Sequence, residues 1–295
     1  MQMDVLNAVA RVLFVGAAAL LTFPASGQSS RLTSQQVIDR IKGHVGVDWH
    51  EPTVDTFKAG DPQAPVTGIA VVMMSTLDVL QRAAAAGSNL IITHEPTFYD
   101  HNDRTSDLEA ENDAVLAAKQ AFIKSHGLVI WRFHDYWHRR RPDGIQTGMV
   151  HKLGWDGRKL HRNDTLFVLP ETTVAKLASD IKKRLGIRAL RVVGVPEMKV
   201  TKVGLSAGFP GFAAQRHLLQ SDDVQVLVMG EAHEWETIEY AVDAVTTNRG
   251  KALIVLGHIP SEQAGMEECA RWLKTFVTEV PITYISTPEP FWLAK

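Results

Sequence analysis

The sequence predicts an α/β fold made of two similar α/β lobes that arise from an internal duplication. Strand-like apolar runs alternate with helix-like amphipathic segments, which is typical of mostly parallel sheets. The same order of strands, helices and polar strand ends also recurs in the two halves of the chain. Because ligands of open α/β sheets bind beyond the carboxyl ends of the strands, we expect a site in the crevice between the lobes.

The chain begins with a pattern typical of a secretory signal peptide, predicted at residues 1–27. An apolar run at residues 12–21 follows Arg11 and precedes small residues, and it is too short to span a bilayer as a helix. Cleavage before Gln28 would give a secreted or periplasmic protein with no membrane span. The alternative is an uncleaved N-terminal anchor.

The first lobe is predicted at residues 28–158 and is completed by residues 250–295. Thr33 is a suitable N-cap for its first helix, and Gly87 and Gly127 are stop signals for the next two. The predicted helices cover residues 34–43, 75–87 and 107–127, and the predicted strands cover residues 68–74, 89–93 and 128–133. The composition of residues 139–144 indicates a turn.

The second lobe is predicted at residues 159–249. Its strands are expected at residues 165–170, 189–196, 201–208 and 224–230, and its helices at residues 171–186, 213–221 and 234–250. A strand at residues 252–258, a helix at 266–276 and a strand at 282–286 follow.

Composition restricts the chemistry that the protein can perform. The net charge of −2 argues against a nucleic-acid partner. The single cysteine, Cys269, excludes an internal disulfide framework and a cysteine-based zinc site, and its helical context predicts a core position. Any metal must therefore be bound by the carboxylates and the 12 histidines.

Polar residues end corresponding strands in the two halves. The second strand of each half ends in a glutamate, and the third ends in a histidine with a further potential ligand four positions later. These residues are Glu95, His134 and His138 in the first half, and Glu231, His258 and Glu262 in the second. His94 directly precedes Glu95, and burying both is costly unless something pairs with them. We expect the four strand ends to converge; the alternative is a set of unrelated capping, loop or core positions.

The chain resembles the NIF-three-like dinuclear-metal family, also labelled GTP cyclohydrolase type 2-like, over nearly its whole mature length. The resemblance rests on VDW (47–49), IITHEP, VMGE and, most specifically, LGHIPSE. It implies a two-lobed α/β fold, two metal ions between the lobes and a homo-oligomer, a ring-shaped hexamer. Residue by residue, it implies that His94, His258 and Glu262 are metal ligands.

Two positions depart from the family pattern. Glu95 replaces a second histidine, and His138 replaces an aspartate. The exchange preserves the total of nitrogen and oxygen ligands, so we predict that both residues bind metal. The alternatives are that one metal position has been lost, or that Asp135 is a substitute ligand. The glycine-rich loop at residues 206–211 is also altered, and is either an anion-binding turn or only a tight turn.

The resemblance and the ligand types together predict a dinuclear metal-dependent hydrolase acting on a small molecule. The two divalent ions would be Zn, Mn, Fe or Ni, with Glu262 as the bridging ligand. His134 and Glu231 are the predicted catalytic residues, which orient ligands or transfer protons; a satisfied core histidine is the alternative for His134. The residues 139–141 bind an anionic substrate or form a solvated turn. The alternative function is a metal-binding or metal-delivery protein without turnover.

Overall fold

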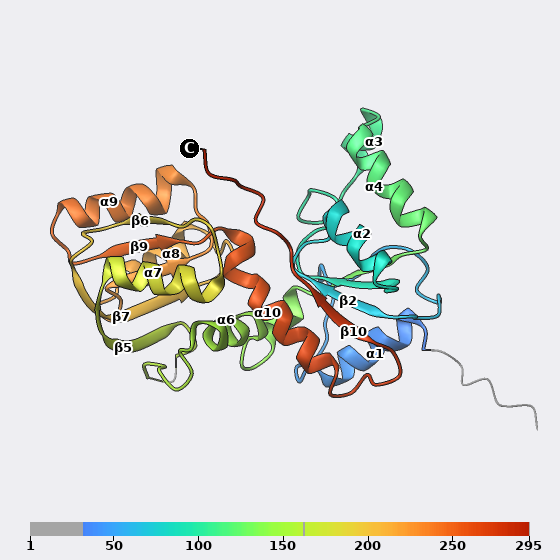
Figure 1. Ribbon diagram of the computed structural model, residues 1–295, viewed down its shortest axis with the longest axis horizontal. Helices are drawn as coiled ribbons and strands as arrows, with labels where there is room; N and C mark the ends of the chain where they lie inside the picture. Colours follow the sequence, from blue (N-terminus) through green and yellow to red (C-terminus); the bar gives the residue numbers. More distant parts are fainter. Residues whose placement is uncertain (1–31, 162, 295) are drawn as a thin grey trace, which may run out of the picture. The chain divides into compact units, whose positions relative to one another are not determined.

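Two five-stranded sheets with helices packed against them organise the chain (Figure 1). The structure is a computed structural model that describes residues 32–161 and 163–294. The predicted signal peptide at residues 1–27 lies outside the described residues. Among those described, no helix combines the length and apolar character needed to cross a bilayer.

The first sheet has the strand order β1-β4-β3-β2-β10. In sequence order these strands are β1 (Phe57–Ala59), β2 (Ile69–Val72), β3 (Leu90–Thr93), β4 (Val129–Arg132) and β10 (Ile282–Ile285). All neighbouring pairs are parallel except β1 with β4. Ile69 and Val71 enter one hydrophobic core, whereas Ala70 and Val72 enter another on the opposite face. Burial on both faces explains why the strand is a continuous apolar run.

The helices of the first half begin at polar caps. They are α1 (Ser34–His44), α2 (Leu77–Ala85), α3 (Ser106–Ala110), α4 (Ala114–Ser125), α5 (Asp135–Arg139) and α6 (Gly144–Leu153). Thr33 caps α1 in a capping box with Gln36, as its sequence predicts. The single helix predicted at residues 107–127 is wrong, because Asn112 adopts φ 54° and Asp113 caps a new helix, α4. The strand β1 and the helices α5 and α6 were not predicted.

The second sheet has the order β5-β7-β8-β9-β6. Its strands are β5 (Leu166–Thr173), β6 (Arg191–Val193), β7 (Lys199–Ser206), β8 (Val226–Met229) and β9 (Ala252–Val255). The neighbours β7, β8 and β9 are parallel, and the two outer strands are antiparallel to them. Its helices are α7 (Val174–Leu185), α8 (Phe212–Gln220) and α9 (Glu239–Thr246). A π-helix, η1 (Glu234–Ile238), replaces the start of the helix predicted at residues 234–250.

The two sheets share the order of their parallel strands. In the first sheet β2, β3 and β4 are consecutive, and β7, β8 and β9 are consecutive in the second. The mixed α/β fold with two sheets is therefore confirmed, and the duplication stays a prediction. Because β9 pairs in the second sheet, the return to the first lobe comes after Val255, not at residue 250. The other lobe boundaries stay predictions.

The helix α10 (His258–Leu273) follows β9 and packs against α6. It begins eight residues before the predicted start at residue 266, since Gly257 turns the chain at φ 94° and Pro260 is tolerated in a first turn. A Cβ on Gly148 would lie 2.2 Å from the Ala264 carbonyl oxygen, so the two helices approach closely at glycine. Side chains of both helices enter the main cores of both sheets, and Cys269 is buried in the first core as predicted.

Candidate metal centre

The strand ends that carry polar residues converge in one cluster. In the first half, His94 and Glu95 follow β3; His134 is the N-cap residue of α5, which comes after β4, and His138 lies within α5. In the second half, Glu231 follows β8, and His258 and Glu262 lie in the first turns of α10. Carboxyl ends of parallel strands share one edge of a sheet, which explains the convergence within each half. The helix α10 makes the contacts between the halves: Glu262 lies beside His94, and His258 lies beside Glu95, the two residues that follow β3.

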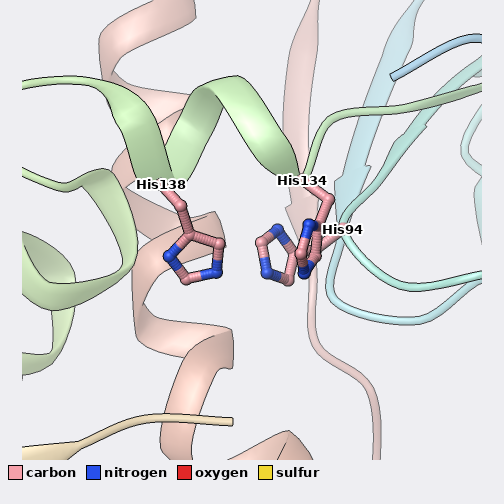
Figure 2. A group of neighbouring side chains, drawn as sticks. All are labelled: His94, His134 and His138. Atoms are coloured by element: carbon pink, nitrogen blue, oxygen red, sulfur yellow. The ribbon is translucent and has the colours of Figure 1, made fainter. Parts of the chain in front are cut away.

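Three imidazole rings lie side by side in the cluster (Figure 2). The ring centroid of His94 lies 4.7 Å from that of His134 and 5.0 Å from that of His138, and the last two are 5.0 Å apart. Each ring has its Nδ1 engaged: with the Phe133 carbonyl oxygen at 3.1 Å for His94, with Asp135 at 2.9 Å for His134, and with Asp143 at 2.9 Å for His138. Such contacts leave the Nε2 atoms available as ligands.

His94 is suited to metal binding by its burial. Its side chain is fully buried, and its Nε2 makes no hydrogen bond within the described part of the chain. Burial, followed by electrostatic interactions with the His134 and His138 rings, lowers the pKa of His94 well below its ordinary value. The ring is therefore neutral, and its Nε2 lone pair faces the cluster unpaired.

Glu262 supplies a second buried atom that makes no hydrogen bond. Its Oε2 makes no hydrogen bond among the described residues, and it lies 3.6 Å from His94 Nε2 and 3.2 Å from His258 Nε2. Its Oε1 lies 3.9 Å from His138 Nε2. A buried carboxylate requires a positive charge close by. A metal ion between these atoms would satisfy both the carboxylate and the His94 nitrogen.

His258 supplies positive charge to the cluster when no metal is bound. Its Nε2 lies 3.1 Å from Glu95 Oε1, and its Nδ1 lies 3.1 Å from Glu231 Oε1. Although burial opposes it, the contacts with the Glu262 and Glu95 carboxylates raise the pKa of His258 to about 11. The protonated ring thus donates from Nε2 to Glu95, forms an ion pair with Glu231 through Nδ1, and joins carboxylates from the two halves of the chain.

Arg132 is a residue of the site that was not predicted. Its side chain is fully buried at the end of β4, where its Nε donates to the His94 carbonyl oxygen at 3.0 Å and its Nη2 donates to Glu95 Oε2 at 3.3 Å. Burial alone would raise the pKa of Glu95, but the His258 hydrogen bond and the nearby imidazoles lower it. Arg132 occupies one carboxylate oxygen and leaves Oε1 facing the cluster. The only signal in the sequence was an arginine inside an apolar strand.

Two buried or half-buried aspartates hold the imidazoles in place, and neither was predicted. Asp55 accepts hydrogen bonds from the backbone N–H groups that begin α5. Asp143 binds His138 and also caps α6 through the Gln146 N–H. Asp135, considered as a substitute ligand, accepts a hydrogen bond from Thr53 Oγ1 at 2.9 Å while it holds His134.

The loop at residues 206–211 lies against the cluster. Gly208 has φ +62°, and a Cβ there would lie 2.2 Å from Glu262 Oε1, so only glycine fits. Its N–H donates to Ser261 Oγ at 3.0 Å, which makes the loop a support for α10. The arginines that follow His138, at residues 139–141, have mainly local contacts. Arg140 lies over the rings of two tryptophans, and Arg141 donates hydrogen bonds to backbone carbonyl oxygens.

The donor set can hold metal. Two groups of potential ligand atoms, each with all atoms within 4.8 Å of one another, share His94: one with His134 and His138, the other with Glu95 and Glu262. Mixed imidazole and carboxylate ligands suit Zn, Mn, Fe or Ni. The two buried atoms that make no hydrogen bond among the described residues, His94 Nε2 and Glu262 Oε2, fit this interpretation.

Comparisons with known proteins agree with this fold. The model of the Duf34/NIF3 (NGG1p interacting factor 3) family matches residues 48–290. A Clostridium acetobutylicum protein named GTP cyclohydrolase 1 type 2 homolog is 24% identical over 152 residues, covering 48% of this chain and 54% of that protein. The chain thus spans about half the length of the curated relative it matches.

Solved structures extend the similarity in fold over most of the chain. The Staphylococcus aureus hypothetical protein SA1388 has a TM-score of 0.71 at 16% identity, covering 90% of this chain and 100% of that one. A Bacillus cereus protein related to NIF3 has a TM-score of 0.70 at 14% identity, with the same coverage of 90% and 100%. At such identities these matches show the fold alone.

Proposed function

Because the chain belongs to the Duf34/NIF3 (NGG1p interacting factor 3) family, we propose that it is a metal-dependent hydrolase that acts on a small molecule with two divalent metal ions. The observation that carries this proposal is a pair of buried atoms that make no hydrogen bond among the described residues, His94 Nε2 and Glu262 Oε2, 3.6 Å apart. The name of the Clostridium relative refers to a cyclohydrolase, a hydrolytic enzyme, and supports the same class of reaction.

The proposed ligands are His94, Glu95, His138, His258 and Glu262. When bound, two metal ions in such a site activate a water molecule and polarise the bond that it attacks. Glu262 suits a bridging position, since its two oxygens face different histidines: Oε2 faces His258 and Oε1 faces His138. Arg132 fixes Glu95 so that only one of its oxygens is free to bind.

His134 and Glu231 are proposed to handle protons. Both lie at the solvent-accessible side of the cluster, where the Glu231 side chain is 50% exposed and His134 is partly exposed. His134 Nε2 lies 3.9 Å from Glu95 Oε1, and Glu231 Oε1 lies 3.1 Å from His258 Nδ1, at ion-pair distance. Buried ligands with partly exposed acid–base groups beside them favour a site that admits substrate over a closed structural one.

Two further proposals concern the state of the protein in the cell. We propose a homo-oligomer, a hexamer if it follows the family resemblance, and a mature chain beginning near Gln28 in the periplasm or outside the cell. Sedimentation of the purified mature protein tests the first. N-terminal sequencing of the native protein tests the second, and an intact Met1 would contradict it.

The metal content of Glu262→Ala tests the proposed function. We expect this variant to fall from about two ions per chain towards one or none, and to lose hydrolysis of phosphoesters, cyclic amides or nucleotides in a substrate screen. Glu231→Ala should keep its metal and lose activity. Glu267→Ala is the matched control, because Glu267 lies on the same helix but pairs with Lys152 at the surface.

The outcomes separate the alternatives. If Glu262→Ala keeps the metal content of the parent, the proposed centre is wrong. If the parent binds metal but turns over no compound in the screen, a metal-binding or metal-delivery protein without turnover becomes the better explanation.

A further inference from the structure

Three exposed aromatic rings form a stack beside the candidate metal centre. The ring centroids of Phe209 and His233 are 5.0 Å apart with their planes inclined by 51°, and those of His233 and Trp235 are 4.6 Å apart with their planes inclined by 14°, so only the second pair is stacked face to face. Trp235 is 71% exposed and Phe209 is 39% exposed. We call these three residues the aromatic stack. Exposed tryptophan faces of this kind are frequent where a protein binds a partner or ligand.

The aromatic stack is held to the metal centre by two loops. Phe209 directly follows Gly208, whose backbone lies against Glu262. His233 is two residues after Glu231, which binds His258. The Glu231 N–H donates to the Gly208 carbonyl oxygen at 3.1 Å, so the loops that carry the rings are bonded to each other.

Hydrogen bonds of a buried side chain anchor the base of the aromatic stack. Trp235 lies in the π-helix η1, a rare conformation that often occurs at functional sites. Below it, the buried Gln215 side chain donates to the Glu231 carbonyl oxygen at 2.8 Å and accepts a hydrogen bond from Thr237 Oγ1. The same buried amide therefore supports both the loop of the metal centre and the helix that presents the tryptophan.

The charges around the aromatic stack restrict what it can bind. Glu231, Glu234 and Glu236 lie on the same segment; Glu234 pairs with Arg191 at 2.6 Å, and Glu236 contacts His233 at 3.1 Å. Carboxylates and the negative faces of aromatic rings both favour a cationic or neutral ring over an anionic one.

The size of the patch argues against a protein partner. Its three partly exposed side chains offer a few hundred Å² at most, since one aromatic side chain buries about 150–250 Å². A stable protein interface takes roughly 800 Å² from each partner. A single planar ring system matches the patch better.

We propose that the aromatic stack binds a planar heteroaromatic ring, neutral or cationic, of the substrate of the adjacent metal centre. This inference rests on the proposed function, which makes the neighbouring cluster a metal-dependent active site. It adds the chemical class of the substrate. Binding occurs by stacking on the face of Trp235 that His233 does not cover, and so does not require the metal.

The test uses chelator-treated full-length mature protein and three probes with one ring and different charges. These are 1-methylnicotinamide (cationic), nicotinamide (neutral) and nicotinate (anionic), with cyclohexanecarboxamide as the non-aromatic control. Affinities are measured by NMR through the signals of each probe, which are present with every variant. In the parent, the indole N–H signal of Trp235, identified by its loss in Trp235→Phe, shows whether the probe binds there. We expect 1-methylnicotinamide and nicotinamide to bind more tightly than nicotinate, and cyclohexanecarboxamide to bind least.

Variants locate the binding. Trp235→Ala should weaken the binding of nicotinamide and 1-methylnicotinamide by about tenfold, within the range for stacking on one aromatic side chain. Phe209→Ala should have a smaller effect in the same direction, because Phe209 packs against His233, which in turn packs against Trp235. Trp235→Phe should retain most of the binding. Trp292→Ala is the matched control, because Trp292 is 76% exposed and lies near the C-terminus; this variant should bind like the parent.

Several results would overturn the inference. They are equal affinities in the parent and Trp235→Ala, equal binding of the saturated control, or no binding of any planar probe to the parent. Dissociation of an oligomer by Trp235→Ala would instead make the patch a contact between copies of the chain. A parent that binds nicotinamide but no metal refutes only the metal-dependent function, whereas a parent that binds metal but no ring refutes only this inference.

Discussion

Glu95 occupies a position where the family resemblance leads one to expect a histidine, and Arg132 makes this carboxylate compatible with burial. The guanidinium lies 3.3 Å from Glu95 Oε2 and also holds the backbone of His94. A buried charge whose partner is removed destabilises a protein by roughly 3–5 kcal/mol. Arg132 therefore contributes to the fold and to the orientation of a proposed metal ligand.

A double-mutant cycle separates these two contributions. Arg132→Met should weaken Zn²⁺ binding by about 10- to 100-fold, because Glu95 loses the group that orients it. In the Glu95→Gln background the same change should have a smaller effect on both Zn²⁺ affinity and stability. Calorimetric titration and urea unfolding of the metal-free proteins measure the two quantities, with the exposed Arg104→Met as the control. Strictly additive effects would show that Arg132 does not act through Glu95.

The buried Lys119 side chain should make the free energy of unfolding depend on pH. Burial lowers the pKa of Lys119 from 10.5 to about 8, although the charge of Asp103 opposes this. Between these pH values the unfolded chain binds the extra proton, so the free energy of unfolding should rise with pH, by up to about 3 kcal/mol. In Lys119→Met this contribution to the rise should be absent. Urea unfolding of both proteins between pH 7.5 and 10.5 measures it, and parallel curves would contradict the prediction.

The helix α5 shows how one aspartate positions two histidines. A helix of five residues is not stable by itself. Asp55 accepts hydrogen bonds from the N–H groups of His134 at 2.7 Å, Asp135 at 2.9 Å and Tyr136 at 2.9 Å. The position of the His134 and His138 rings thus depends on a residue from the segment before β1.

Asp55→Ala should therefore lower both stability and metal content. Loss of the cap should cost about 1–2 kcal/mol, and the displaced histidines should bind metal less tightly. Asp113→Ala is the matched control, because Asp113 caps α4 through the Leu116 N–H; it should lose about 1 kcal/mol of stability and no metal. Chemical unfolding and elemental analysis measure both effects. An unchanged metal content in Asp55→Ala would show that α5 holds its place without the cap.

The sequence predicts strands better than helix ends in this protein. Apolar runs such as that of β3 are buried on both faces, so their hydrophobicity is a direct consequence of their position. The start of α10 was missed because Pro260 and Ser261 resemble a loop, although a proline is tolerated in a first helical turn. The short edge strand β1 has no apolar signal, since its three residues are only partly buried.

The site could be predicted only as far as its strand ends. His94, Glu95, His258 and Glu262 end or follow recognisable strands, and the structure brings them together. Arg132, Asp55 and Asp143 could not be found in this way. Their roles depend on contacts with backbone groups and side chains that only the folded chain brings near.

At the scale of the whole molecule, the crossing of α6 and α10 connects the cores of the two sheets. Gly148 and Gly265 lie at this crossing, and a Cβ on Gly265 would lie 2.4 Å from the Ile145 Cα. Backbones that approach so closely leave no space for a side chain. The crossing therefore fixes where α10 places His258 and Glu262 relative to His94.

Gly148→Ala should force the two helices apart. We expect a loss of about 1–3 kcal/mol in stability and weaker metal binding, because the ligands of α10 move away from His94. Gly43→Ala is the control: Gly43 lies within α1 with open space around it, so alanine should be neutral or stabilise the protein by up to about 1 kcal/mol. Thermal unfolding and Zn²⁺ titration measure both effects. If the two variants behave alike, the helix crossing is not a constraint on the site.

The position of α10 and β10 in the chain determines when the centre can form during synthesis. The strands of the second sheet are all translated before residue 258, whereas β2 waits for β10, its partner on one edge (Figure 1). A nascent chain at that stage exposes an unpaired strand edge, which favours aggregation and chaperone binding. It also lacks two of the five proposed ligands. The proposed centre could therefore be loaded with metal only late in the biogenesis of this protein, after translation has passed α10.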